Sequence, residues 1–161
     1  AIFNKCKETK EKSHDPYFNK LEHELSFLKN NWPTNLPKAI IHADLFQDNI
    51  FFKEDKISGV IDFYFSCEDF IAYELALTIN AWCFHLNEGF QIENYQSLIE
   101  GFNEHSSLNN EEIKALNILL RGAAVRILVT RLHDKIYHPD DAVLQGKRCR
   151  VHRVLGRHLQ S

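Results

Sequence analysis

The sequence predicts an α+β fold that is mostly helical, with one helix, then a β-hairpin, then a bundle of helices. Apolar residues repeat at helical spacing in residues 16–31 and again from residue 69 onward. Between these regions, short β-rich runs flank a polar turn at residues 54–56. A chain of 161 residues is long enough for one domain with a sizeable core.

The first helix is expected to begin at Asp15 and Pro16, because an acidic cap followed by proline is a common helix start. Its apolar positions continue to about residue 31, and the Trp-Pro and Leu-Pro pairs of residues 32–37 predict a linker. Residues 38–42, 49–53 and 57–62 are short strand-like runs. The last two are separated only by the polar turn, so we expect them to pair as a hairpin.

Helical periodicity returns over residues 69–85 and 92–104. A third, long apolar stretch runs from Asn109 to about Tyr137, and Glu112 lies three positions after Asn109, as in a capping box. Aromatic side chains around the hairpin and in the following helix are expected to belong to the core rather than to a stacking surface; they are Phe46, Phe51, Phe52, Phe63, Phe65, Trp82 and Phe84.

Composition excludes several classes of protein. A formal net charge of −3 argues against nonspecific nucleic-acid binding, and no run approaches the roughly 20 apolar residues that cross a membrane. The lysine-rich N-terminus does not resemble a signal peptide, and the four cysteines are far apart with no CxxC motif. We therefore expect a cytoplasmic protein with reduced thiols and neither nucleic-acid nor membrane partners. Because the sequence contains no methionine, it is not expected to begin where its gene begins.

Basic residues are concentrated at the C-terminal end. Residues 145–161 hold five Lys and Arg and no acidic residue, whereas residues 1–144 hold 14 basic and 22 acidic residues. Two interpretations stay open for this segment. It is either a frame-shifted or misjoined end near Gly146, or a basic interaction arm.

The most informative motif is H-x-D-x-x-x-x-N, formed by His42, Asp44 and Asn49, followed by an apolar strand that ends at Asp62. A tight loop between strands can present Asp44 and Asn49 at one mouth, to which the hairpin also brings Asp62. Two carboxylates and an amide oxygen suit Mg²⁺ held together with substrate phosphates. A carboxylate that is not bound to the metal can accept a proton from an attacking hydroxyl. His42 is expected to hold the loop by hydrogen bonds rather than to act as the base.

The body of the chain has three arginines, Arg121, Arg126 and Arg131, spaced five apart. On one helix Arg121 and Arg131 would lie about 80° apart, so these two can converge while Arg126 points elsewhere. A guanidinium group suits a substrate carboxylate. Salt bridges to acidic neighbours explain the arginines equally well.

The motifs resemble the catalytic and metal-binding loops of the aminoglycoside phosphotransferase/choline kinase superfamily, whose fold is like that of protein kinases. The stretches LPKAIIHADLFQDNIFF and SGVIDFYFSC carry this resemblance, and AYELALTINAWCF and RGAAVRILVTRL point to its homoserine kinase branch. The resemblance implies that Asp44 is the catalytic base, that Asn49 and Asp62 bind Mg²⁺, and that His42 supports the catalytic loop. It also implies ATP and L-homoserine as substrates, in threonine biosynthesis.

The sequence departs from this family at its N-terminal end and in the basic C-terminal segment described above. The family has an N-terminal lobe with a glycine-rich loop and a lysine, and no such elements precede Asp15. We therefore expect residues 1–144 to form a kinase-like C-terminal lobe, without the N-terminal lobe and inactive alone. Choline, ethanolamine or aminoglycoside kinases are the alternative within this class. A non-catalytic kinase-like binding fragment and a metal-dependent phosphohydrolase are alternatives outside it.

Overall fold

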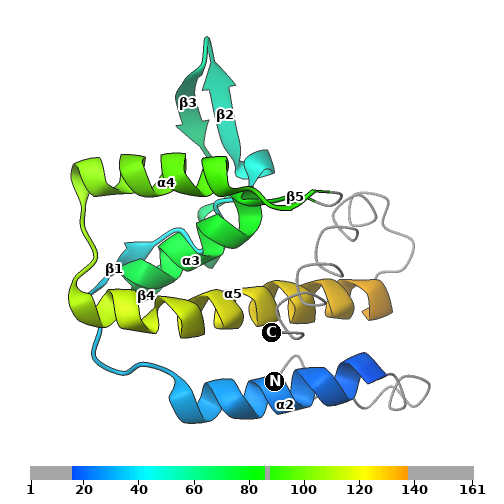
Figure 1. Ribbon diagram of the computed structural model, residues 1–161. Coiled ribbons are helices and arrows are strands. Elements are labelled where there is room, and N and C mark those ends of the chain that lie inside the picture. The colour runs from blue at the N-terminus through cyan, green and yellow to red at the C-terminus, as the bar shows by residue number, and fades with distance from the viewer. Residues whose placement is uncertain (1–15, 86–87, 138–161) are drawn as a thin grey trace. The chain divides into compact units, whose positions relative to one another are not determined.

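The computed structural model describes residues 16–85 and 88–137, and it has the α+β, mostly helical composition that the sequence predicts (Figure 1). The chain divides into two compact units. We call Pro33–Ala123 the central unit, and Ala1–Trp32 together with Ala124–Ser161 the terminal unit. All residues of the predicted H-x-D-x-x-x-x-N motif belong to the central unit.

Within the terminal unit, the described residues other than Trp32 are helical. Helix α2 spans Pro16–Asn31, which confirms the first predicted helix; its expected cap, Asp15, lies outside the described residues. Helix α5 spans Asn110–Tyr137, and its residues from Ala124 onward belong to this unit. The buried apolar side chains of the unit are Phe18, Leu21 and Leu28 on α2 and Ala124, Val125 and Val129 on α5.

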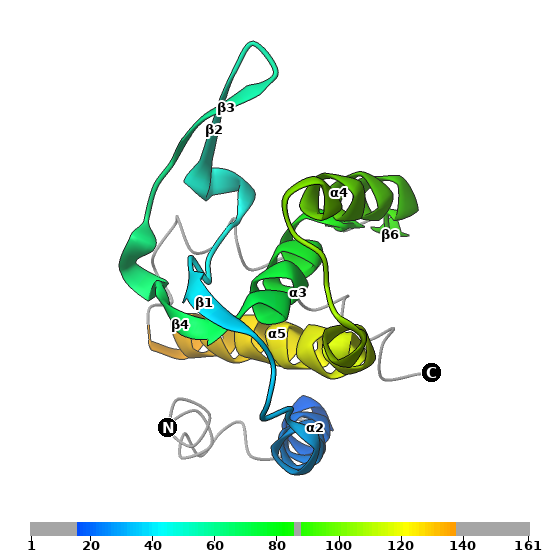
Figure 2. The ribbon, with the colours of Figure 1, turned by 90° about the vertical axis from the view of Figure 1, so that its left-hand side faces the viewer.

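A two-stranded antiparallel sheet opens the central unit. Strand β1 (Lys38–Ile41) pairs with β4 (Cys67–Phe70), so that Lys38 lies opposite Phe70 (Figure 2). The predicted strand at 38–42 is thus confirmed. The last two residues of its partner strand, Asp69 and Phe70, were expected to begin the next helix. Helix α3 begins only at Ile71, whose N–H donates to the Pro37 carbonyl. Pairing with β1 therefore extends the strand through Phe70, and two residues assigned to the helix by periodicity join the sheet.

The predicted hairpin is confirmed. Strands β2 (Ile50–Lys53) and β3 (Lys56–Val60) pair antiparallel, with an irregular register next to Phe52. Glu54 and Asp55 form the two-residue turn, and both have positive φ angles (52° and 62°), as a turn that matches the strand twist requires. The hairpin projects from the rest of the unit (Figure 1).

The expected burial of the hairpin aromatics is wrong. Phe51 and Phe52 are 52% and 56% exposed, and Phe63 and Phe65 are exposed as well. Two strands form only one layer, and Phe52 stays more than half exposed although its ring contacts Trp82. The aromatic residues of the α3 region behave as expected, since Trp82 and Phe84 are partly buried.

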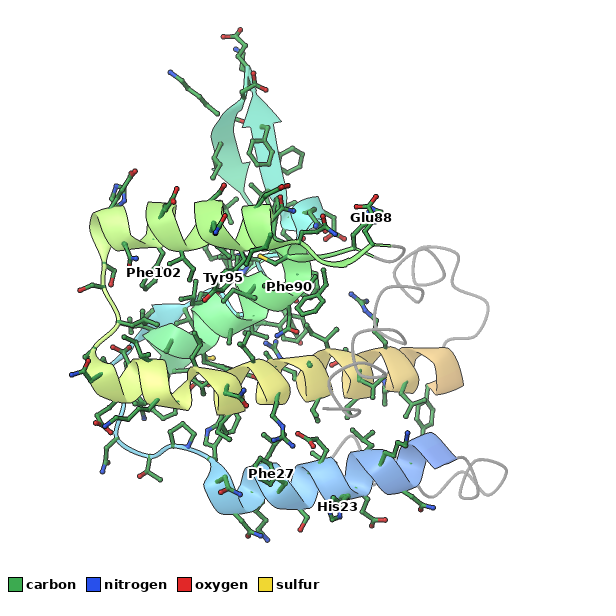
Figure 3. All side chains as sticks on the ribbon, viewed as in Figure 1. His23, Phe27, Glu88, Phe90, Tyr95 and Phe102 are labelled. Carbon is green, nitrogen blue, oxygen red and sulfur yellow. The ribbon has the colours of Figure 1, made fainter. Side chains whose placement is uncertain are left out.

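The core of the central unit forms where α3 (Ile71–Trp82) meets α4 (Ile92–His105) and the first turns of α5. Leu75, Ile79 and Cys83 are buried at its centre. Tyr95 and Phe102 point from α4 toward α3, and Phe90 packs on Tyr95 (Figure 3). Phe90 lies in β6 (Gly89–Phe90), which pairs with β5 (Phe84–His85).

Helix α5 begins with the predicted capping box. The Asn109 side-chain oxygen accepts hydrogen bonds from the N–H groups of Glu111 and Glu112, and the Glu112 carboxylate accepts one from the Asn109 N–H. Among the described residues, no helix is both long and apolar enough to cross a membrane. Residues 145–161 lie outside the described part of the chain, so both interpretations of the basic end stay open.

The core thiol makes stability depend on pH. Burial raises the pKa of Cys83 from 9.0 to about 11, because the thiolate would lose its hydration. The unfolded chain ionises this thiol near pH 9, whereas the folded chain keeps it protonated until about pH 11. The Cys83 contribution to the free energy of unfolding should therefore be intact below pH 9 and fall by about 2–3 kcal/mol as the pH rises through 11.

Cys83→Ala isolates this effect from other groups that titrate at alkaline pH. We expect wild type to be more stable than Cys83→Ala at pH 8 and to lose that advantage by pH 11, as measured by urea unfolding at each pH. A stability difference that does not change with pH would contradict the prediction.

Candidate active site

The 42–49 loop connects β1 to the hairpin, and Asn49 holds its two ends together. A 3₁₀ turn, η1 (Gln47–Asn49), brings the Asn49 side chain back toward Asp44. The Asn49 Nδ2 atom donates to the Asp44 backbone carbonyl at 2.8 Å and to Asp44 Oδ2 at 3.1 Å. Because one amide group contacts both the backbone and the carboxylate, it fixes the side chain of Asp44 as well as the loop.

His42 ties this loop to the strand that leads to Asp62. Its Nδ1 atom accepts a hydrogen bond from the Asp44 N–H at 3.2 Å, and its Nε2 atom lies 2.9 Å from the Ile61 carbonyl oxygen. Nδ1 therefore carries no proton, and Nε2 donates to Ile61. The ring is buried at 8% exposure and packs against Phe63. Both nitrogens bind the backbone, so His42 holds the loop to the segment before Asp62.

Ala43 holds a left-handed conformation, with φ of 62°, between these two motif residues. A non-glycine residue in this region costs about 1–3 kcal/mol of strain unless its surroundings support it. The support comes from Glu74 on α3, whose Oε2 atom accepts a hydrogen bond from the Ala43 N–H at 2.8 Å. The Glu74 contact holds the peptide between His42 and Ala43, one residue before Asp44.

Asp62 is presented differently from Asp44. It follows β3 with a left-handed backbone, φ 64° and ψ 58°, and its side chain is exposed and does not cap the following 3₁₀ turn, η2 (Phe63–Phe65). The Ile61 N–H donates to the Asn49 carbonyl at 3.0 Å, so the backbone just before Asp62 is tied to Asn49. The structure thus joins His42, Asp44, Asn49 and the segment carrying Asp62 through backbone contacts.

The oxygen atoms that remain suit a hard divalent cation. The Asn49 nitrogen is occupied, whereas its side-chain oxygen and the Asp62 carboxylate have no hydrogen-bond partner among the described residues. Within the described part of the chain, no three His, Cys, Asp or Glu side chains form a group that could hold a metal. The donor set fits Mg²⁺, which is commonly bound through one or two carboxylates together with water and substrate phosphates.

The three arginines lie on α5. Arg121 lies on α5 in the central unit, whereas Arg126 and Arg131 belong to the terminal unit. All three side chains are partly buried and have interactions of their own. Binding of a substrate carboxylate by Arg121, Arg126 or Arg131 stays a prediction.

Sequence reasoning missed the contacts of α3 that hold the loop. Besides Glu74, the Trp82 Nε1 atom donates to the Leu45 carbonyl at 2.7 Å, and the Gln47 Nε2 atom donates to the Ala81 carbonyl at 3.0 Å. These bonds end on backbone groups, which every residue carries, so no sequence pattern marks them. The only signal was the presence of Glu74 and Trp82 on the helix after the motif.

Comparison with known proteins agrees with the motif. Residues 4–106 match the model of the phosphotransferase enzyme family. A homoserine kinase from Parvibaculum lavamentivorans is 42% identical over 159 residues, covering 94% of this chain and 50% of the relative. A homoserine kinase from Sinorhizobium fredii is 46% identical over 77% of the chain and 38% of the relative. One from Bartonella henselae is 42% identical over 91% and 46%. The chain spans half or less of the length of these relatives.

The two bonds of His42 predict a structural cost for its removal. His42→Ala leaves the Ile61 carbonyl and the Asp44 N–H without their His42 partner, so the free energy of unfolding should fall by about 1–3 kcal/mol. His85 is the matched control, because it is exposed and its contact with Glu88 spans 3.8 Å. His85→Ala should change stability by less than about 0.5 kcal/mol in urea unfolding. Equal losses in both variants would contradict the supporting role of His42.

Proposed function

We propose, because the chain belongs to the phosphotransferase enzyme family, that it carries the catalytic loop of an ATP-dependent kinase that phosphorylates the hydroxyl group of L-homoserine. The observation that carries this proposal is the double contact of the Asn49 nitrogen with Asp44. It leaves one carboxylate oxygen of Asp44 and the amide oxygen of Asn49 for different tasks. The first suits proton transfer and the second suits metal binding.

In this proposal each residue of the site has one role. Asp44 orients the substrate hydroxyl and accepts its proton as the oxygen attacks phosphorus. Asn49 and Asp62 hold Mg²⁺, which when bound offsets the negative charge of the ATP phosphates. His42 and Glu74 touch no substrate and keep the backbone around Asp44 in place.

The substrate is inferred from the relatives. Each of the three reported relatives is named a homoserine kinase, at 42–46% identity. Homoserine differs from choline in offering a carboxylate, for which Arg121, Arg126 and Arg131 are the proposed partners. Because the relatives are at least about twice as long, the chain alone is proposed to be inactive, and the assay requires the protein at the full length of its relatives.

Asp44→Asn and Asp62→Asn should separate proton transfer from metal binding. Asp44→Asn keeps the shape of the side chain and removes the proton acceptor, so kcat should fall by roughly 10²–10⁴-fold with nearly unchanged affinity for Mg²⁺–ATP. Asp62→Asn should weaken Mg²⁺–ATP binding as well as turnover, because it removes a charged ligand. Steady-state kinetics with ATP and homoserine, beside nucleotide titration, measure both effects.

Asp55→Asn is the control, because Asp55 lies in the exposed hairpin turn and asparagine tolerates its positive φ. This variant should keep wild-type kinetics. Equal loss of nucleotide affinity in Asp44→Asn and Asp62→Asn would make Asp44 a metal ligand. Phosphorylation of choline, ethanolamine or an aminoglycoside in place of homoserine would overturn the substrate assignment. ATP binding without transfer would indicate a binding protein, and phosphate release without an acceptor a phosphohydrolase.

The arginine assignment has its own test. Replacing the arginine that binds the homoserine carboxylate with alanine should raise KM for homoserine by roughly thirtyfold, since a charge-assisted hydrogen bond contributes about 2 kcal/mol. KM for ATP should stay the same. Lys114→Ala is a matched control, because Lys114 is an exposed cation on the same helix and pairs with Glu111. Unchanged kinetics in Arg121→Ala, Arg126→Ala and Arg131→Ala would remove all three from the site.

A further inference from the structure

The C-terminal end of α3 holds the middle of the 42–49 loop at two points. The Trp82 indole N–H donates to the Leu45 carbonyl at 2.7 Å, and the Gln47 side-chain amide donates to the Ala81 carbonyl at 3.0 Å. Leu45 directly follows Asp44, and Gln47 precedes Asn49 by two residues. Both contacts therefore fall within the stretch of chain that separates Asp44 from Asn49.

Three contacts hold Trp82 in place. Its partly buried side chain packs against the core formed by Leu75, Ile79 and Cys83, and its ring meets the edge of Phe52 at 6.4 Å between centroids. The Asn94 side chain on α4 donates to its backbone carbonyl at 3.2 Å. A ring fixed by this packing has a fixed N–H direction, so it can hold the Leu45 carbonyl at a defined place.

We propose that Trp82 is a positioning residue that sets the place of the 42–49 loop, and with it of Asp44 and Asn49, against α3 by holding the Leu45 carbonyl. This inference depends on the proposed function, because it assigns Asp44 to proton transfer and Asn49 to metal binding. Hydrogen bonds within the loop, from the N–H of Phe46 to Asp44 and from the N–H of Asn49 to Phe46, make it a compact turn. Such a turn can still shift as a body, and Trp82 joins it to the helical core. Displacement of a reactive group by about 1 Å can reduce turnover a hundredfold.

Trp82→Phe removes the indole N–H and keeps an aromatic ring in the core. In the protein at the full length of its relatives, we expect kcat to fall by roughly ten- to a hundredfold and the half-saturating Mg²⁺ concentration to rise. KM for homoserine should change little, because Trp82 touches no substrate in this proposal. Amide exchange at Phe46 and Asn49, measured by mass spectrometry without substrate or metal, should become about fivefold faster because one hydrogen bond that holds the loop is lost.

Phe102→Leu is the matched control. Phe102 packs against the same core from α4, and no described contact joins it to the loop. It should lower the melting temperature about as much as Trp82→Phe while kcat, Mg²⁺ dependence and loop exchange stay near wild type. If both variants lost turnover equally, or if Trp82→Phe kept wild-type kinetics and exchange, the proposal would be wrong.

Two further outcomes can be distinguished: the Trp82 variant does not fold, or the wild-type protein has no kinase activity. If Trp82→Phe does not fold, Trp82→Tyr also removes the indole N–H and keeps a larger aromatic ring, and unchanged loop exchange in that variant would overturn the proposal. If the wild-type protein phosphorylates no alcohol, the proposed function fails. The exchange measurement then still decides whether Trp82 holds the loop, because it requires no activity.

Discussion

The candidate site depends on one neutral imidazole between two backbone groups. His42 accepts from the Asp44 N–H through Nδ1 and lies within hydrogen-bond distance of the Ile61 carbonyl through Nε2, so it joins segments 19 residues apart. An imidazole that carries its proton on Nε2 has an acceptor and a donor on one rigid ring, so it can make both contacts in a buried place. Since Asp62 follows Ile61 directly, this single ring places both carboxylates of the motif relative to each other.

Outside the hairpin turn, the described non-glycine residues with a left-handed backbone lie beside the same contacts. Ala43 and Asp62 both have left-handed conformations, and each lies next to a group that His42 binds. Such conformations persist only where the surroundings support them. Glu74 gives that support at Ala43, and the bond from the Ile61 N–H to Asn49 gives it beside Asp62.

The sequence predicted those features that have a local physical signal. Helix periodicity located α2, α4 and α5, the polar turn located the hairpin, and the Asn109–Glu112 spacing located the cap of α5. Strand β4 was missed because Cys67–Phe70 contains two acidic residues and becomes a strand only through pairing with β1. Burial of the hairpin aromatics was predicted wrongly, since a hydrophobic residue is buried only where a second layer covers it, and that depends on the whole fold.

The same distinction explains which parts of the site were predictable. Asp44, Asn49 and Asp62 stand out because the chemistry requires particular side chains at particular spacings. The contacts that position them are bonds from Glu74, Trp82 and Gln47 to or from backbone N–H and carbonyl groups, which look alike at every residue. His42 and Asn49 are motif residues and also positioning residues, because each binds the backbone of Asp44. A motif residue can therefore hold the loop as well as take part in the proposed chemistry, and its hydrogen bonds separate the two roles.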